Sequence, residues 1–402
     1  MPFLYLAAGA VFATIAARGL TVPLFAHDLG ANRFEVGALF SVATLAGAVL
    51  SLPAGVLVDR FGSRNLLAIS LVLTGGSQVA IALTPSVPPL FLWQVIGGLA
   101  AGMQQSALFS AVTESVSRSR LGRAMGWLTF SMQMGFFTGP AIAGVALRWI
   151  DVRTDIAVTT ALLILTIPGA IAASSTRQQT GQGLSLREPF RALVRQPAFA
   201  PVTLGLIGVT LTWGTIGAFL PIFGKEALQL PSSQVGYLLA LQAVVNGASR
   251  IPAGRLIDRI SRRWPVVFVG AVVWSVVMIA LGHMTGFLWP AVALAVGTPF
   301  MAAAFVAIGV VFADLSTAST RGVTMGMYGT VLFLGLALGP LVFGPIVQGY
   351  GYAAGFTACA IAAVLLVSGM ALLTLQSDRL RRGSEPAPLG DSETRSRATR
   401  QA

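Results

Sequence analysis

The sequence predicts an all-α membrane protein with twelve transmembrane helices in two pseudo-symmetric six-helix halves. Three observations support this prediction: the composition, a series of long apolar runs, and a repeat between the two halves of the chain. The 402 residues are 55% hydrophobic and only 10% charged, with a mean hydropathy of +0.79. A soluble domain carries about 25% charged residues. Much of this chain must therefore face lipid.

Charge-free apolar runs mark the spans, since a spanning helix needs roughly 20 apolar residues. The first helix is expected near residues 3–26, and five further runs each fit one helix: 36–58, 124–147, 156–176, 196–224 and 227–249. Three longer runs each hold two helices around a polar, proline or glycine breaker: 65–113, 264–313 and 322–377. The total is twelve spans.

A repeat divides the chain into halves. The stretch Pro-Ala-Gly-x-Leu-x-Asp-Arg occurs at 53–60 and again at 252–259. Aligning 31–60 with 230–259 gives nine identities in thirty, and aligning 114–144 with 314–344 gives eight in thirty-one. Because each half has an even number of spans, both halves enter the membrane from the same side, so the repeats are parallel.

These boundaries predict four segments. They are an N-terminal bundle at 1–173, a cytoplasmic linker at 174–198, a C-terminal bundle at 199–375 and a disordered, Arg-rich cytoplasmic tail at 376–402. If the two motif turns are cytoplasmic, 21 basic residues lie inside, and only Arg33, Arg148, Arg153 and Lys225 lie outside. This bias favours an inner (plasma) membrane protein with both termini in the cytoplasm.

Several classes of function are excluded by what the sequence lacks. The net charge of +12 comes from short clusters between apolar runs, not from the basic face or groove that nucleic acid requires. A single cysteine, Cys359, leaves no disulfide within the chain and no cysteine-based metal site. Two histidines and no acid pair at membrane depth leave no catalytic set. We therefore expect no enzyme, no cofactor and no metal.

Arg18 is the charge that lies deepest in an expected span, about 15 residues or roughly 22 Å along the first helix. Thr14, Arg18 and Thr21 are spaced i, i+4 and i+7, so they share one face. No acid lies at matching depth, and an unpaired charge in a membrane is costly. Arg18 is therefore expected to face a cavity and an anionic ligand, although snorkelling to the surface is the alternative.

Other polar residues predict where this cavity lies. They are Gln94 and Gln105 on the fourth span, Gln133 on the fifth, Thr210 and Trp213 on the seventh, and Gln242 and Asn246 on the eighth, where Arg250 continues the stripe. Interhelical hydrogen bonds are an equally good explanation for the glutamines and threonines. Trp213 also fits a packing or interface role.

Over residues 1–375, the chain resembles the major facilitator superfamily. The family's loop motif G-x-L-x-D-R-x-G-R-K is matched by Gly55, Leu57, Asp59, Arg60, Gly62 and Arg64, while Ser63 departs from it. The second copy has Gly254, Leu256, Asp258, Arg259 and Arg263, with Ser261 in place of the second glycine. The resemblance implies the fold of that superfamily, with these turns acting as a cytoplasmic gate.

A carboxylate at such a turn can dock on a helix N-terminus, where N–H groups and the helix dipole favour an anion. The expected contacts are Asp59 with the helix start near Gly322, Asp258 with that near Gly122, Arg60 or Arg64 with Glu114, and Arg259 or Arg263 with Asp314. The alternative is that these loop charges only set the topology.

The fifth span carries a second motif, formed by Gly126, Gly135, Gly139, Pro140 and Gly144. It is similar to the antiporter signature of the superfamily's exporters, with Ala143 in place of one glycine. The same spacing recurs 200 residues later, so part of the pattern reflects packing. Gln94 stands where proton-coupled exporters of the family usually have an arginine, four residues before a glycine.

The sequence therefore predicts a secondary active transporter that works by alternating access. Our leading hypothesis is export of small amphipathic or anionic molecules, drugs or metabolites, by proton antiport. The alternative is an organic-anion uptake carrier, exchanger or facilitator without proton coupling. We expect a monomer whose partners are the small-molecule substrate, protons in the antiport hypothesis, and the lipid bilayer.

Overall fold

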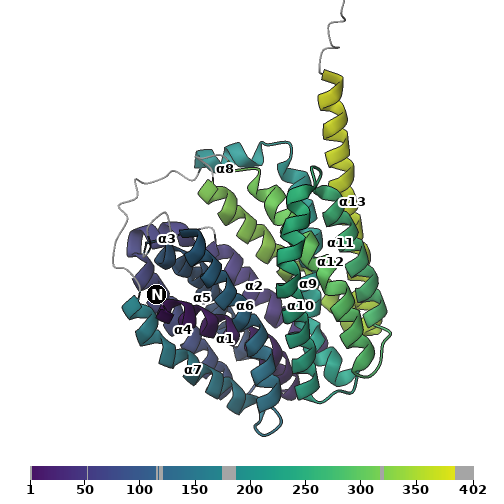
Figure 1. Ribbon diagram of the computed structural model, residues 1–402. Helices are drawn as coiled ribbons and strands as arrows, with labels where there is room; N and C mark the ends of the chain where they lie inside the picture. Colours follow the sequence, from purple (N-terminus) through teal and green to yellow (C-terminus); the bar gives the residue numbers. More distant parts are fainter. Residues whose placement is uncertain are drawn as a thin grey trace, which may run out of the picture.

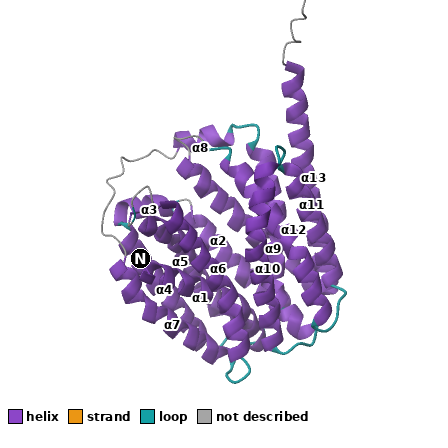
Figure 2. Ribbon diagram, in the orientation of Figure 1, coloured by secondary structure: helices purple, strands orange, loops and turns teal. Residues whose placement is uncertain are grey.

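A computed structural model describes residues 2–51, 53–114, 116, 121–173, 187–316 and 321–384. All regular secondary structure in this part of the chain is helical (Figure 2). The helices stand side by side as two bundles, with the short helices α3 and α8 at the end of the molecule that carries the motif turns (Figure 1). We call this the motif end, and the other the opposite end.

The first half contains six long helices and one short one: α1 (Pro2–Asp28), α2 (Arg33–Ser51), α3 (Ala54–Phe61), α4 (Ser63–Leu83), α5 (Val87–Glu114), α6 (Leu121–Ala146) and α7 (Val152–Ala173). The second half contains α8 (Arg187–Val194), α9 (Phe199–Glu226), α10 (Ser232–Arg259), α11 (Trp264–Leu281), α12 (Leu288–Ala313) and α13 (Arg321–Ser384). In α13, Gly351 has a φ of 86° and separates two helical arms.

The count of twelve spans is confirmed. Nine helices in the described ranges are individually long and apolar enough to cross a membrane, and one of these, α13, holds two spans. The remaining two spans are α6 and α10. Of these, α10 ends in the charged motif of the second half, which lowers its average hydropathy.

Three predicted boundaries are wrong. The second span was expected over 36–58, but α2 ends at Ser51 and a separate short helix, α3, begins at Ala54. The eighth span was expected at 227–249, but α10 runs from Ser232 to Arg259 and contains the second copy of the motif. Similarly, α13 continues to Ser384, so residues 376–384 of the expected disordered tail are helical. The end of an apolar run marks only where the lipid ends. A helix can continue beyond that point into water when its residues have high helix propensity. Residues 385–402 lie outside the described ranges.

The two halves meet through corresponding pairs of helices. Within the halves, α1 packs on α6 and α9 packs on the first arm of α13, while α2 packs on α13 and α6 on α10 across the interface between the halves. Side chains of α2 bond to α13 along its length: Ser41 Oγ to Ala337 O at 2.8 Å, and Ser51 Oγ with Thr330 Oγ1 at 3.0 Å. The interface is thus pseudo-symmetric, as the repeat predicts.

The two motif copies differ at the second glycine for a backbone reason. Gly62, between α3 and α4, has a φ of 80°, a conformation that glycine adopts without strain. In the second copy, α10 ends at Arg259, the next residue Ile260 has φ −102° and ψ 122°, and Ser261 follows without a positive φ. The second turn therefore does not require the glycine that the first one needs.

Candidate functional site

Arg18 on α1 is held by α5 inside the first half. Its Nη2 donates a hydrogen bond to Oε1 of Gln94, whose side chain is buried. One turn further along α5, a Cβ on Gly97 would lie 2.3 Å from Nη1 of Arg18. The fourth span thus supplies both a neutral acceptor and the space that the guanidinium occupies.

No ion pair in the described part of the chain involves Arg18. The two threonines of its predicted face do not extend the site, because they are buried and donate to their own helix: Thr14 Oγ1 to Ala10 O at 2.9 Å and Thr21 Oγ1 to Ala17 O at 3.1 Å. Arg18 is therefore the member of this face that reaches another helix.

A second arginine, Arg250, lies within a spanning helix. The boundaries expected from the sequence had placed it just beyond the end of that span. Arg250 on α10 donates from Nε to Oδ1 of Asn246 at 3.1 Å. Its Cζ lies 5.5 Å from the ring centroid of Phe305 on α12, and that ring meets Trp213 of α9 at 5.4 Å with an interplanar angle of 61°. The spacing of Gln242, Asn246 and Arg250 at i, i+4 and i+8 could have predicted that Arg250 belongs to the same helix face.

The remaining predicted polar residues separate into packing and accessible positions. Thr210 is buried and donates to Leu206 O at 2.7 Å, and its Oγ1 would lie 1.9 Å from a Cβ on Gly335. It is a packing residue between α9 and α13. Nε2 of Gln133 lies 3.3 Å from the Cβ position of Gly247, across the contact between the halves. Gln105 is exposed, and Gln242 is partly buried.

The glycines of the fifth-span motif permit close packing on two sides of α6. A Cβ on Gly139 would lie 2.2 Å from Ala13 O of α1, and Gly135 packs on α1 in the same way. Gly144 faces the other half, where its Cβ would lie 2.9 Å from Cα of Gly236 on α10. In the second half, Gly339 packs on α9 and Gly344 on α2. The packing explanation of the motif therefore accounts for these glycines in both halves.

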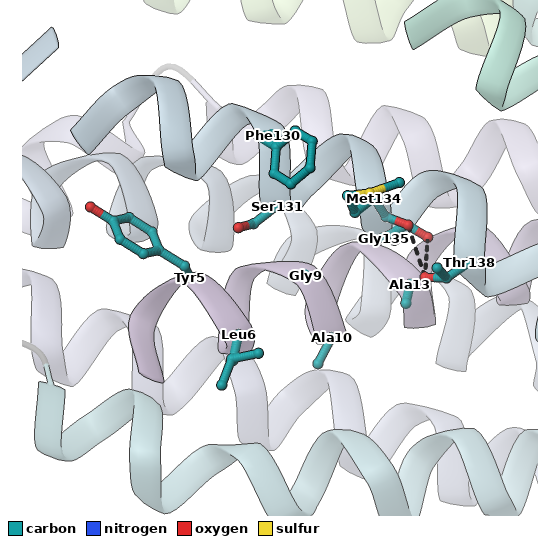
Figure 3. A pocket seen from close by; sticks show the side chains of 10 residues that line it. All are labelled: Tyr5, Leu6, Gly9, Ala10, Ala13, Phe130, Ser131, Met134, Gly135 and Thr138. Carbon is teal, nitrogen blue, oxygen red and sulfur yellow. Dashed lines mark hydrogen bonds between the residues drawn. The ribbon is translucent and has the colours of Figure 1, made fainter. Parts of the chain in front are cut away.

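A pocket of ≈ 300 Å³ lies between α1 and α6 (Figure 3). Its lining is mostly apolar: Tyr5, Leu6, Gly9, Ala10, Ala13, Phe130, Ser131, Met134, Gly135 and Thr138. The hydroxyl of Thr138 donates to the backbone oxygens of Met134 and Gly135, as the dashed lines show. Of the functional residues predicted from the sequence, only Gly135 lines this pocket. The pocket is therefore separate from Arg18 and Arg250.

At the opposite end, Glu226 on α9 binds side chains from three other helices. It accepts from Nε of Arg33 on α2 at 2.7 Å and from the hydroxyl of Tyr352 on α13 at 2.9 Å, and it lies 3.0 Å from Nε2 of His27 on α1. Lys225 adds an ion pair to Asp28 at 2.6 Å. We call these five residues and Tyr352 the Glu226 cluster: His27, Asp28, Arg33, Lys225, Glu226 and Tyr352.

The Glu226 cluster joins the two halves, and sequence reasoning missed it. The sequence placed Arg33 and Lys225 outside the membrane, but it gave no sign of their partners, since Arg33 and Glu226 are 193 residues apart. Arg33 also donates its backbone N–H to Gln348 of α13 at 2.9 Å, and its Cζ lies 4.7 Å from the centroid of the Tyr352 ring. Within the described residues, the ion pairs that bridge the halves all lie at this end.

At the motif end, Arg263 pairs with Asp314, one of the contacts expected for that acid, and both residues belong to the second half. Asp258 and Arg259 are exposed, Arg64 is partly buried, and Arg60 lies over the ring of its neighbour Phe61. Gly254 has open space around its Cβ position. The side chains of Asp59 and Glu114, and the surroundings of Gly55, Gly122, Gly126 and Gly322, lie outside the described part, so the contacts predicted there stay predictions.

No group of three His, Cys, Asp or Glu side chains that could hold a metal ion occurs among the residues that the structure describes. Two bundles of membrane-spanning helices define a multi-pass membrane protein, and its family shows that it is a transporter rather than an enzyme. The chain belongs to the Major Facilitator Superfamily, whose family model matches residues 4–231 and again 202–400.

Among known proteins, an uncharacterized MFS-type transporter of Methanocaldococcus jannaschii is 22% identical over 368 residues, which cover 88% of this chain and 94% of the relative. The quinolone resistance protein NorA of Staphylococcus aureus is 27% identical over 123 residues, covering 31% of this chain and 32% of NorA.

Two solved structures share the fold. A bacterial homolog of the human lysosomal transporter Spinster superposes with a TM-score of 0.78 at 15% identity, covering 92% of this chain and 95% of that one. The nucleoside transporter NupG gives a TM-score of 0.75 at 15% identity, covering 92% and 98%.

Proposed function

We propose that this transporter exports small amphipathic or anionic molecules by alternating access, in exchange for protons. The observation that carries the proposal is the pairing of Arg18 with a neutral amide. A positive charge inside a membrane is costly and marks a functional site by default. With Gln94 as its acceptor, Arg18 keeps its full charge and its remaining N–H donors for an anionic group of the substrate.

Alternating access requires that the halves separate at one end while they close at the other. The Glu226 cluster supplies contacts that hold the opposite end together and that must break when this end opens. The proposed counterpart at the motif end consists of Asp59 and Asp258 docking on the starts of two helices, with Glu114 pairing with Arg60 or Arg64. The close crossing of α6 and α10 is a suitable pivot.

Two observations support export, which remains part of the proposal. The motif on α6 is similar to the superfamily's antiporter signature, and part of the chain is similar to a quinolone resistance protein. The excess of basic residues at the motif end supports an inner-membrane protein with both termini in the cytoplasm. We further propose that it acts as a monomer.

The alternative proposal is an organic-anion carrier, exchanger or facilitator without proton coupling. Gln94 favours it, because an uncharged side chain occupies the place where proton-coupled exporters of the family usually have an arginine. Within the described ranges, the acids that pair with other side chains lie near the two ends of the bundle rather than beside Arg18.

Transport into proteoliposomes tests both proposals. Purified protein is reconstituted, and uptake of radiolabelled organic anions is measured with and without an imposed pH gradient, for the wild type and for Arg18→Ala. The antiport proposal expects uptake that follows the gradient and is lost in Arg18→Ala. Arg255→Ala is the matched control, because Arg255 is exposed at the motif end. Uptake that ignores the gradient favours the carrier, and unchanged uptake of every anion by Arg18→Ala contradicts both.

A further inference from the structure

We propose that Arg250, Phe305 and Trp213 form a binding site for aromatic carboxylates in the second half, separate from Arg18. This inference rests on the proposed function, in which the cargo is a small anion, and it specifies the chemical class of that cargo. The three residues come from α10, α12 and α9, and each is partly exposed. Part of each side chain is thus left uncovered by the protein.

The charge of Arg250 is only partly compensated. Its Nε is used by Asn246, a buried neutral amide, at 3.1 Å. None of the ion pairs in the described ranges includes Arg250. A guanidinium has five N–H donors in a planar fork, and the fork binds a carboxylate through two parallel hydrogen bonds. The two terminal nitrogens of Arg250 are suited to that bidentate contact.

The surroundings of Arg250 favour a flat apolar group beside the carboxylate. The Phe305 ring lies 5.5 Å from the guanidinium carbon, and the Trp213 ring packs against Phe305 edge to face. Aromatic rings prefer such tilted or offset contacts with one another. A ligand whose carboxylate is bound by Arg250 would place an attached ring next to this pair of aromatic side chains. An aliphatic carboxylate would make the ionic contact without the aromatic one.

The two arginines lie at different depths. Arg250 is nine residues before the end of α10, about 13 Å from the motif end, whereas Arg18 is sixteen residues from the start of α1, about 24 Å from that end. A molecule that enters from the motif end meets Arg250 before Arg18. The site therefore fits an early contact on the substrate's path rather than a duplicate of the Arg18 site.

Equilibrium binding to the purified full-length protein tests the site. The probes are benzoate, cyclohexanecarboxylate and benzyl alcohol, and the readouts are tryptophan fluorescence and isothermal titration. We expect benzoate to bind most tightly, and Arg250→Gln to weaken it by about tenfold or more, because a hydrogen bond to a charged group is lost. Phe305→Leu should weaken benzoate while leaving cyclohexanecarboxylate unchanged. Arg255→Gln on the same helix is the matched control and should bind as the wild type does.

The site is wrong if Arg250→Gln binds benzoate as tightly as the wild type, if Phe305→Leu weakens both carboxylates equally, or if the wild type binds none of the probes. If Arg250→Gln fails to fold, Phe305→Leu and Arg250→Lys still test the site. Lysine keeps the positive charge but lacks the planar fork of N–H donors, so Arg250→Lys should also weaken benzoate binding. Arg18-dependent anion uptake in proteoliposomes, combined with failure of these binding tests, would reject this site and leave the proposed function standing. Loss of both would reject both.

Discussion

Arg18 and Gln94 are joined by a hydrogen bond from Nη2 to Oε1, across the contact between the first and fourth spans. Proton-coupled exporters that this chain resembles usually have an arginine at the position of Gln94. In this protein the guanidinium comes from the first span, and the fourth span contributes an uncharged acceptor. A positive group is thus present at this contact, although a different helix carries it.

Gln94→Glu should strongly reduce anion transport without unfolding the protein. A carboxylate at this position would form an ion pair with Arg18 and neutralise the charge that we propose binds the substrate. We expect uptake of organic anions in proteoliposomes to fall by about tenfold or more. Ser86→Glu, at an exposed loop position just before the same helix, is the control and should transport normally. Equal losses in the two variants would argue against a special role for Arg18.

Gly97→Ala should displace Arg18. The new Cβ would lie 2.3 Å from Nη1, so the guanidinium must move away from Gln94. The clashing atoms are the far end of a flexible side chain, so the guanidinium can move without strain on the backbone. We expect weaker anion binding with little change in the melting temperature. Gly76→Ala on α4 meets nothing within 4 Å and should change neither quantity. Unaltered anion binding by Gly97→Ala would show that the position of Arg18 does not matter.

Glu226→Gln should loosen the opposite end of the bundle. The substitution removes the charge that Arg33 and His27 contact, and charge-assisted hydrogen bonds contribute about 1.5–3 kcal/mol each. The measurement is the labelling rate, with a membrane-impermeant maleimide, of a cysteine introduced in place of Phe40, which lies between the halves beside Gly217. We expect labelling to be about tenfold faster than in the parent, both in a Cys359→Ala background.

The control for this experiment is Glu35→Gln. Glu35 lies at the same end but contacts Asn32 within the first half, so its loss should leave labelling unchanged. If Glu226→Gln is labelled no faster than Glu35→Gln, the Glu226 cluster does not hold the halves together.

Gly144→Ala should impair the contact between the halves. Its Cβ would lie 2.9 Å from Cα of Gly236, a backbone atom that cannot rotate away. We expect α6 and α10 to be forced apart, with a lower melting temperature and reduced transport. Gly254→Ala in the second motif copy has open space around it and should leave the melting temperature unchanged. A Gly144→Ala variant as stable as Gly254→Ala would show that this crossing tolerates separation.

Much of the architecture could be predicted because its causes are local in the sequence. Lipid offers no partner for backbone N–H and C=O groups, so long apolar runs form helices, and their number follows from run length and breakers. The repeat of Pro53–Arg60 at Pro252–Arg259 predicts two parallel halves. The ends of α10 and α13 were misjudged because hydropathy marks the edge of the membrane, not the end of a helix.

The partners of the polar side chains were decided only by the tertiary structure. The sequence singled out Arg18 and Gln94, but their contact depends on how α1 and α5 are rotated about their axes. Arg33 and Glu226 lie 193 residues apart and meet because the two halves close at the opposite end. Arg250 acquired its aromatic neighbours in the same way, from α9 and α12. Helix rotation and the docking of the halves arise from packing over the whole interface, which no local pattern of residues encodes.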